Sequence, residues 1–352
     1  MIGLVPTLAE LLTASDDPGA AVCVVVDGAV VDEAMTGTRD GVTHWSDDTL
    51  VMGYSVAKPF AALTVLTVVR EGRLGLDQPV ADLWPAYAAH GKGATTVRHV
   101  LAHQAGVPCF PEAAAGVAYD DREALVALLA DAVPDHPPGQ GIAEHALTYG
   151  HLCDQLVRTA TGEGLAERFA RIAADHGWDL HLRVAADDLG RVADVVAVEP
   201  AWPARYVDDP RWGPALTRPA GLLDPAELNT ERWRTTSFPA IGVHASARGL
   251  ATFYGQLMAD DGAVAALLGP ELHRAYVGAQ ASGHDRLLDR EVVWTLGFQV
   301  DDVDIGMGGA GGCGAWWSFG GRYAAAYVTR GLGNHDRSDP IYDLLEERYA
   351  ER

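Results

Sequence analysis

A proline at the head of an apolar run fixes where one helix of this chain begins. Apolar side chains recur at helical spacing over residues 60–69, and the run stops at Gly72. Proline is tolerated only in the first turn of a helix, so Pro59 prevents this helix from starting far upstream of Ser55. Ser55 is therefore expected at the mouth of a helix, with Lys58 three residues later on the same face.

This arrangement favours an activated serine. An amine that is desolvated near the positive end of a helix dipole has a lowered pKa and can accept a hydroxyl proton. The sequence contains only two lysines, Lys58 and Lys92, so a Ser-x-x-Lys pattern seldom arises in it by chance. The simpler interpretation is that Ser55 caps the helix and Lys58 is solvated. The local sequence leaves both interpretations open.

Composition excludes several classes of partner. The 352 residues are 48% hydrophobic and carry a formal charge of −22, which describes a globular chain with an acidic surface. Such a surface repels phosphate backbones and anionic lipids, so neither nucleic acid nor a membrane is an expected partner. No apolar window is long enough to span a bilayer. The oligomeric state is open.

The first residues and the cysteines indicate a cytoplasmic chain. Residues 1–15 lack a basic start and carry Glu10 in their apolar part, which does not suit a secretory signal. The four cysteines are widely spaced, without a Cys-x-x-Cys pattern, so we expect reduced thiols, no disulfide framework and no metal site. No cofactor is expected.

The order of elements predicts an α/β fold of the α+β kind. Residues 20–26 and 29–35 form a predicted hairpin around Asp27-Gly28. Strand character returns near the C-terminus. The predicted helices cover 4–13, 96–106, 123–133, 149–162, 165–176, 245–258, 263–268 and 340–349, and the late strands cover 292–300, 303–306 and 323–329.

We therefore expect an antiparallel sheet built from N- and C-terminal strands and flanked by helices. The sheet-containing part would comprise residues 1–58 and 286–352, and a large, mostly helical insertion would comprise 59–285. The active site would lie at their interface. Residues 184–229 are rich in Pro, Asp and Trp and read either as long loops over a cleft or as a disordered excursion.

Three further features are candidates for the site. Tyr149 begins a predicted helix after a Pro-Gly turn, and its phenol could take the serine proton if an ammonium lowered its pKa, with His151 orienting the network. The alternative is a buried, hydrogen-bonded tyrosine. The glycine run over 306–314 could supply an oxyanion amide, or form a bulge or hairpin. His99 and His103 stand one helical turn apart, but no third ligand accompanies them.

The order of these pieces resembles the serine β-lactamase and penicillin-binding-protein superfamily, especially class C β-lactamases, DD-peptidases and family VIII carboxylesterases. The resemblance covers nearly the whole chain. Residues 55–59 look like the first motif, 71–77 and 100–108 like framework segments, 149–151 stand where the family has Tyr-x-Asn or Tyr-x-His, 245–254 resemble the helix before the third motif, and 306–312 stand where it has Lys-Thr-Gly or His-x-Gly.

The resemblance implies a mechanism. Ser55, deprotonated by the Lys58 and Tyr149 pair, would attack an acyl carbonyl, and the amides of Ser55 and Ala310 would hold the oxyanion. Water, or an alcohol or amine acceptor, would then take the acyl group.

The chain departs from the family at the third motif. Met307, followed by Gly308 and Gly309, stands where the family carries Lys or His. Methionine is soft and apolar, so binding of a substrate carboxylate is weakened. A small neutral ester or amide is the expected substrate of an esterase or acyltransferase.

Alternative functions remain open on sequence. The chain could be an amide hydrolase of the β-lactamase or DD-peptidase type, or a catalytically impaired binding module. Residues 53–57 are also a near miss to the nucleophile elbow of α/β-hydrolases, but the helical middle of the chain speaks against that fold. The acyl group, the acceptor and the pathway are not encoded in any recognisable motif.

Overall fold

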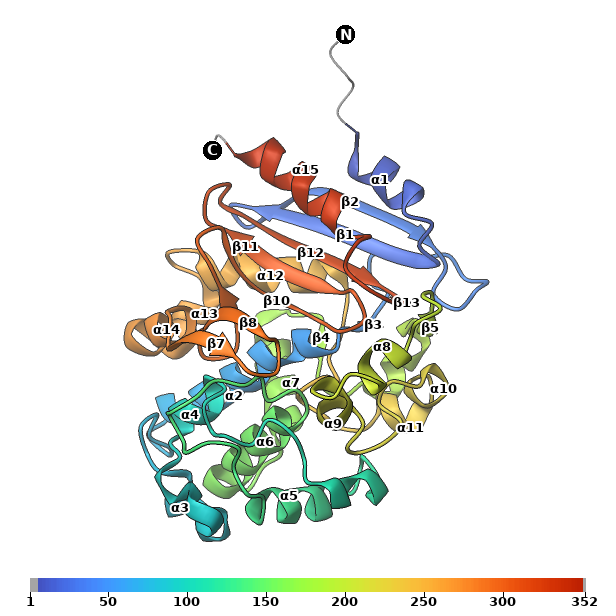
Figure 1. Cartoon of the computed structure of the whole chain (residues 1–352). Coiled ribbons are helices and arrows are strands. Elements are labelled where there is room, and N and C mark those ends of the chain that lie inside the picture. Colours follow the sequence, from blue (N-terminus) through green and yellow to red (C-terminus); the bar gives the residue numbers. More distant parts are fainter. Residues whose placement is uncertain (1–5, 351–352) are drawn as a thin grey trace.

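An eight-stranded antiparallel sheet forms one side of the molecule (Figure 1). The computed structural model describes residues 6–350. Strands from the two ends of the chain meet where β1 pairs with β12, so the predicted sheet architecture is confirmed. In sheet order the strands are β2 (Ala29–Gly37), β1 (Gly19–Val26), β12 (Tyr323–Thr329), β11 (Gly314–Ser318), β10 (Asp304–Gly308), β9 (Gln299–Val300), β8 (Arg290–Trp294) and β7 (Ala281–Asp285).

Helices α1 (Leu8–Ala14) and α15 (Asp339–Tyr349) cover one face of this sheet (Figure 1). A capping box in which Thr7 and Glu10 bond reciprocally starts α1, and its apolar side packs in a small core with α15. The predicted start of this helix at Leu4 lies outside the described residues. The C-terminal helix was predicted to within a residue.

The opposite face of the sheet carries the main core. Helix α12 (Ala247–Met258) packs against β1 and β12, and α2 (Lys58–Arg70) lies behind it with every side chain from Lys58 to Val68 buried. A helix that is buried on all sides needs apolar residues all round, which the sequence of α2 supplies. Figure 1 shows α2 on the side of the sheet opposite α1 and α15.

The rest of the chain is mostly helical, as predicted. The boundary between the sheet-containing part and the helical part differs from the expected residue 286. Strand β7, which precedes that residue, already belongs to the sheet, and α12 packs on the sheet. The helices are α3 (Val80–Leu83), α4 (Val97–Leu101), α5 (Arg122–Ala130), α6 (Thr148–Thr161), α7 (Leu165–His176), α8 (Ala204–Val207), α9 (Trp212–Leu216), α10 (Pro225–Leu228), α11 (Glu231–Arg234), α13 (Ala263–Leu268) and α14 (Pro270–Val277).

Short elements connect these helices. The 3₁₀ helices are η1 (Ser55–Ala57), η2 (Pro85–Ala94), η3 (Glu112–Gly116) and η4 (Ala186–Arg191). Two small sheets join β3 (Val51–Met52), β6 (His244–Ala245) and β4 (Leu180–His181), and β13 (Gly331–Leu332) with β5 (Val196–Ala197). Within residues 6–350 no helix has both the length and the apolar composition needed to cross a membrane.

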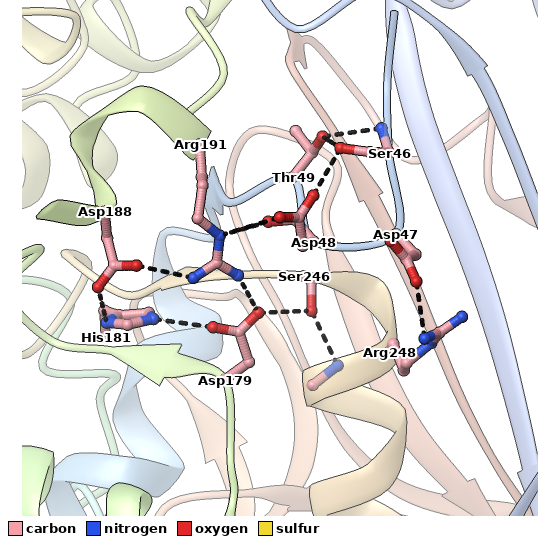
Figure 2. A network of polar contacts seen from close by, with 11 residues as sticks. Ser46, Asp47, Asp48, Thr49, Asp179, His181, Asp188, Arg191, Ser246 and Arg248 are labelled. Carbon is pink, nitrogen blue, oxygen red and sulfur yellow. Dashed lines mark hydrogen bonds and ion pairs between the residues drawn. The ribbon is translucent and has the colours of Figure 1, made fainter.

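The segment 184–229 folds into short helices and turns and is not a disordered excursion. An arginine network fastens its first part. Arg191 donates to the Asp48 carbonyl at 3.1 Å and to the Asp188 carboxylate at 2.8 Å, and it also pairs with Asp179 (Figure 2). This guanidinium, with three acidic residues around it, holds the segment against the loop before β3.

Candidate active site

Ser55 sits at a sharp turn between β3 and α2. The preceding residue, Tyr54, has φ 48° and ψ −127°, an unusual backbone conformation for a residue with a side chain. The Tyr54 hydroxyl donates to the Leu222 carbonyl at 3.2 Å, and its ring packs edge-on against Trp202. The turn leaves Ser55 partly exposed while its neighbours are buried. The predicted helix start is confirmed, and the serine is presented from a fixed backbone.

Lys58 lies directly beside the serine. Its Nζ donates to Ser55 Oγ at 2.6 Å, and its side chain is fully buried. The interpretation of Lys58 as a solvated first-turn residue is therefore wrong. Burial lowers the pKa of the Lys58 amine, and the negative charge of Glu144 opposes this change.

Glu144 is the third member of this cluster, which we call the Ser55–Lys58–Glu144 cluster. Its Oε1 lies 2.9 Å from Lys58 Nζ and 3.5 Å from Ser55 Oγ. The carboxylate is 4% exposed. A buried carboxylate and ammonium are tolerated together because each removes the cost of burying the other alone.

The backbone around Glu144 is held from two sides. The Glu144 amide donates to Asp285 Oδ1 at 3.2 Å, and the next amide, of His145, donates to His103 Nδ1 at 3.0 Å. Asp285 is itself fully buried and also accepts the indole N–H of Trp294 at 3.0 Å. The carboxylate of Glu144 is thus positioned by a polar core and not by a mobile loop.

The predicted role of Tyr149 does not hold in this structure. Its hydroxyl donates to the Leu101 carbonyl at 3.3 Å, the residue is fully buried, and burial raises its pKa well above the ordinary value. Within the described residues it makes no hydrogen bond to Ser55 or Lys58. The prediction was wrong because it placed the start of α6 correctly but not the direction in which this phenol points.

His151 also lies away from the serine. Its ring packs edge-on against Phe110 and Phe238, at centroid distances of 5.3 and 4.7 Å. Burial lowers its pKa to about 4. It is a core histidine and does not orient the catalytic network.

The predicted third motif lies at the end of β10 and packs against the turn that carries Ser55. A Cβ on Gly309 would meet the Gly53 carbonyl oxygen at 2.1 Å, so only glycine allows this approach. Gly308 ends the strand, and Met307, paired with Ala315 on β11, is buried and offers no charge. The strand therefore reaches the site without the cation of the family pattern.

Two amides near this contact are unused. In the part of the chain that the structure describes, neither the Ser55 nor the Ala310 amide donates to a protein acceptor. The Ala310 carbonyl, in contrast, accepts the hydroxyl of Tyr206 from α8 at 2.9 Å. Free, fixed amides of this kind suit an oxyanion.

The histidine pair considered for a metal is not a pair in space. Helix α4 ends at Leu101, and His103 has φ 59°, so the two rings do not share a helical face. His99 Nδ1 accepts the Thr96 amide in a capping box. Across residues 6–350 no group of three or more ligand-type side chains gathers as a metal would require.

A separate cavity of about 480 Å³ lies beside α15. Trp316, Asp304 and Tyr342 contribute to its walls, and none of the three residues of the Ser55–Lys58–Glu144 cluster does. It shares only β10 with the candidate site, so it plays no part in the chemistry considered below.

Sequence reasoning missed Glu144, although a signal was present. Between the turn that ends at Gly139 and the start of α6, Glu144 is the one acidic residue in an otherwise apolar and histidine-containing stretch. A carboxylate in such a stretch is buried only with a partner. With only two lysines in the chain, Lys58 was a natural candidate for that partner.

Comparison with known proteins tests the family resemblance. A sequence model of the β-lactamase family matches residues 7–348. The esterase/β-lactamase LipL of Mycobacterium tuberculosis is 35% identical over 183 residues, covering 51% of this chain and 42% of LipL. Esterase EstB of Burkholderia gladioli is 30% identical over 167 residues, covering 42% of each chain. The chain thus spans about half, or less, of the length of these curated relatives.

Solved structures match over almost the entire chain. A penicillin-binding protein homologue from Caulobacter crescentus is 30% identical with a TM-score of 0.79, over 97% of this chain and 95% of that one. A family VIII carboxylesterase is 25% identical with a TM-score of 0.80, over 96% and 95%. The predicted family and fold are confirmed. The chain belongs to the β-lactamase family.

Proposed function

We propose that this protein is a serine hydrolase that forms an acyl-enzyme on Ser55 and acts on small neutral esters. The observation that carries the proposal is the 2.6 Å contact between Ser55 Oγ and the buried Lys58 Nζ. A hydroxyl at a helix mouth, beside a buried proton-handling pair and two unused amides, has the parts needed for acyl transfer. The esterase relatives LipL and EstB support the ester class.

Acylation would follow from these positions. The Ser55 oxygen attacks the acyl carbonyl, its proton passes to the buried Lys58 and Glu144 pair, and the Ser55 and Ala310 amides hold the oxyanion. Water then releases the acid. An alcohol or amine acceptor in place of water would make the protein an acyltransferase, and the small-molecule acceptor would enter over the 184–229 segment.

The charges at the site favour a neutral acyl donor. The Lys58 ammonium is paired with Glu144 at 2.9 Å, and Met307 supplies no cation from β10. A substrate carboxylate, as in a β-lactam or a peptide terminus, would meet no unpaired positive charge among these groups.

The four cysteines are free, and three of them are buried, which supports a cytoplasmic location for this activity.

Intact-protein mass spectrometry tests the nucleophile. After treatment with a fluorophosphonate, we expect one adduct on the peptide that contains Ser55 and none on Ser55→Ala. Short-chain nitrophenyl esters should turn over, and Ser55→Ala should lower kcat by at least about a thousandfold. An adduct elsewhere, or turnover that survives in Ser55→Ala, contradicts the proposal.

A catalytically impaired binding module is the second candidate, and Met307 is the observation that favours it. If it were correct, the wild type would not hydrolyse esters, and Met307→His would gain activity by restoring a hydrogen-bonding side chain on β10. Hydrolysis of β-lactams faster than esters would instead support the β-lactamase or DD-peptidase type.

A further inference from the structure

Resting on the proposed function, we propose that the Glu144 carboxylate is the general base of this site and that Lys58 remains an ammonium throughout the reaction. This assignment differs from a mechanism in which a phenol or a neutral lysine takes the serine proton. It makes Glu144 a catalytic residue, because its oxygen contacts the reacting hydroxyl.

The arrangement of the three side chains favours this assignment. Lys58 Nζ lies 2.6 Å from Ser55 Oγ and 2.9 Å from Glu144 Oε1. A lysine paired with a carboxylate in this way is held as an ammonium, which has three N–H donors and no lone pair for the serine hydrogen. That hydrogen is left to point at Glu144 Oε1, 3.5 Å away. A shift of less than about 1 Å in the Ser55 side chain would make this a strong hydrogen bond.

Within residues 6–350 no phenol or imidazole hydrogen-bonds to Ser55. The Tyr149 hydroxyl donates to Leu101, and the Tyr206 hydroxyl donates to Ala310. Each phenol is therefore engaged with a peptide carbonyl. Glu144 is the acceptor that geometry leaves for the proton of Ser55, and its neighbour Lys58 can stabilise both the carboxylate and the developing alkoxide.

The proton and electron pairs balance over two steps. In acylation, the Ser55 Oγ–H bond breaks, its proton goes to Glu144, and Oγ bonds to the acyl carbon. Glu144 then gives the proton to the leaving oxygen as the acyl C–O bond breaks, and an alcohol departs. In deacylation, a water proton goes to Glu144 and the water oxygen bonds to the acyl carbon. The Oγ–acyl bond then breaks and Ser55 regains the proton, so ester and water give acid and alcohol.

The surroundings of Glu144 keep the carboxylate oriented. The Glu144 amide donates to Asp285, and the next amide, that of His145, donates to His103. The titratable groups that face Glu144 from the packed elements are Lys58, Tyr206, Asp285, His103 and His145. Because Lys58 is the group in direct contact with the carboxylate, its positive charge stabilises the ionised form that a general base requires.

The test compares Glu144→Gln with Tyr149→Phe, a matched pair in which each variant removes one candidate base. The readouts are the rate of fluorophosphonate labelling and the burst of nitrophenol in a single turnover, measured against pH. We expect Glu144→Gln to lower both at least about a hundredfold and to lose the acid limb of the wild-type profile. Tyr149→Phe should stay within about threefold of wild type.

Glu144→Asp guards against a folding artefact. This variant keeps a negative charge beside Lys58, so we expect it to fold like wild type by circular dichroism. Its side chain is one methylene shorter, so the carboxylate oxygen lies farther from Ser55. Its activity should lie between wild type and Glu144→Gln, and the acid limb should return. Unchanged labelling in both Glu144 variants would overturn the inference, as would a loss in Tyr149→Phe equal to that in Glu144→Gln.

Different results would contradict the assignment of Ser55 as nucleophile and the assignment of Glu144 as base. If Ser55→Ala labels as fast as wild type, or if wild type does not label, the nucleophile is wrong and the role of Glu144 falls with it. If wild type labels on Ser55 and folded Glu144→Gln labels equally fast, only the assignment of the base is wrong.

Discussion

The two lysines of this chain are both fully buried, yet their surroundings differ in kind. Lys58 contacts a hydroxyl at 2.6 Å and a carboxylate at 2.9 Å. Lys92 Nζ instead donates to the peptide carbonyls of Ala89 at 2.9 Å, Ala130 at 3.1 Å and Ala132, and it lies 5.3 Å from the centre of the Tyr87 ring. The same ammonium group is thus held once by side chains that exchange protons and once by fixed dipoles.

The different partners of the two lysines indicate different roles, one in the reaction and one in the fold. A peptide carbonyl accepts a hydrogen bond but takes up no proton near neutral pH, so the Lys92 contacts can only join η2 to the end of α5. The partners of Lys58 can pass a proton between them. Burial alone therefore does not identify a functional lysine, whereas the chemistry of its partners does.

The largest expected effect comes from removing the amine of Lys58. Lys58→Met should lower kcat/KM on short-chain nitrophenyl esters by about a thousandfold or more, because Glu144 loses the charge beside it and the alkoxide loses its stabilising ammonium. Steady-state kinetics with folded protein measure this. A loss smaller than about tenfold would remove the distinction between the two lysines.

Lys92→Met should affect stability and not catalysis. Three carbonyls, two of them in buried hydrogen bonds, lose their donor, which we expect to cost about 3 kcal/mol in the free energy of unfolding. Urea unfolding measures this change, and kcat per folded molecule should stay within about twofold of wild type. If kcat fell as far as in Lys58→Met, the carbonyl-bound lysine would have a role in the reaction.

Buried imidazoles sharpen the comparison, because burial is the main influence on their pKa values. Burial lowers the pKa of His151 to about 4, against about 6.5 in an unfolded chain. The unfolded state therefore binds the proton first, and stability is lost as pH falls from about 6.5 towards about 4, by about 1.4 kcal/mol per pH unit for this group. Above about pH 6.5 the group has no effect.

His151→Phe isolates that contribution. The new ring can pack against Phe110 and Phe238, so unfolding free energies measured between about pH 7 and about pH 5 should fall less steeply than in wild type. His145 and His244, whose pKa values burial lowers to about 3, keep part of the slope in both proteins. Equal slopes would show that His151 takes up a proton in the folded state.

The smallest effect concerns Arg191. Its side chain is 26% exposed, and its partners Asp179 and Asp188 are partly exposed as well. Ion pairs of this kind contribute little each, so Arg191→Met should cost about 1 kcal/mol. Thermal unfolding of wild type and variant should converge as salt is raised to about 1 M. If Arg191→Met lost several kcal/mol of unfolding free energy at every salt concentration, the Arg191 network would contribute to stability as much as a buried lysine does.

The sequence was most informative where local rules decide the structure. Pro59 and helical spacing predicted the contact between Ser55 and Lys58, and turn residues predicted the hairpin of β1 and β2. Strands β7 and β11 were missed because Gly283 and the glycine run before Gly314 hide their short patterns. The contact of Gly309 with Gly53 joins residues far apart in the chain, which only the folded sheet brings together.

The third member of the site was beyond local rules for a different reason. Tyr149 and Glu144 lie five positions apart on the same approach to α6, and either could have faced the serine on sequence alone. The choice depends on how the loop is tied to Asp285 and His103, which come from β7 and from the loop after α4. Long-range hydrogen bonds of this kind leave no periodic trace in the sequence.

The burial of both lysines has a practical consequence for a protein proposed to handle activated acyl groups. Its folded surface offers them no lysine amine to modify. Amine-directed cross-linkers and mass tags should likewise leave Lys58 and Lys92 untouched until the chain opens. The uptake of such a tag at either lysine is therefore a residue-specific clock for unfolding.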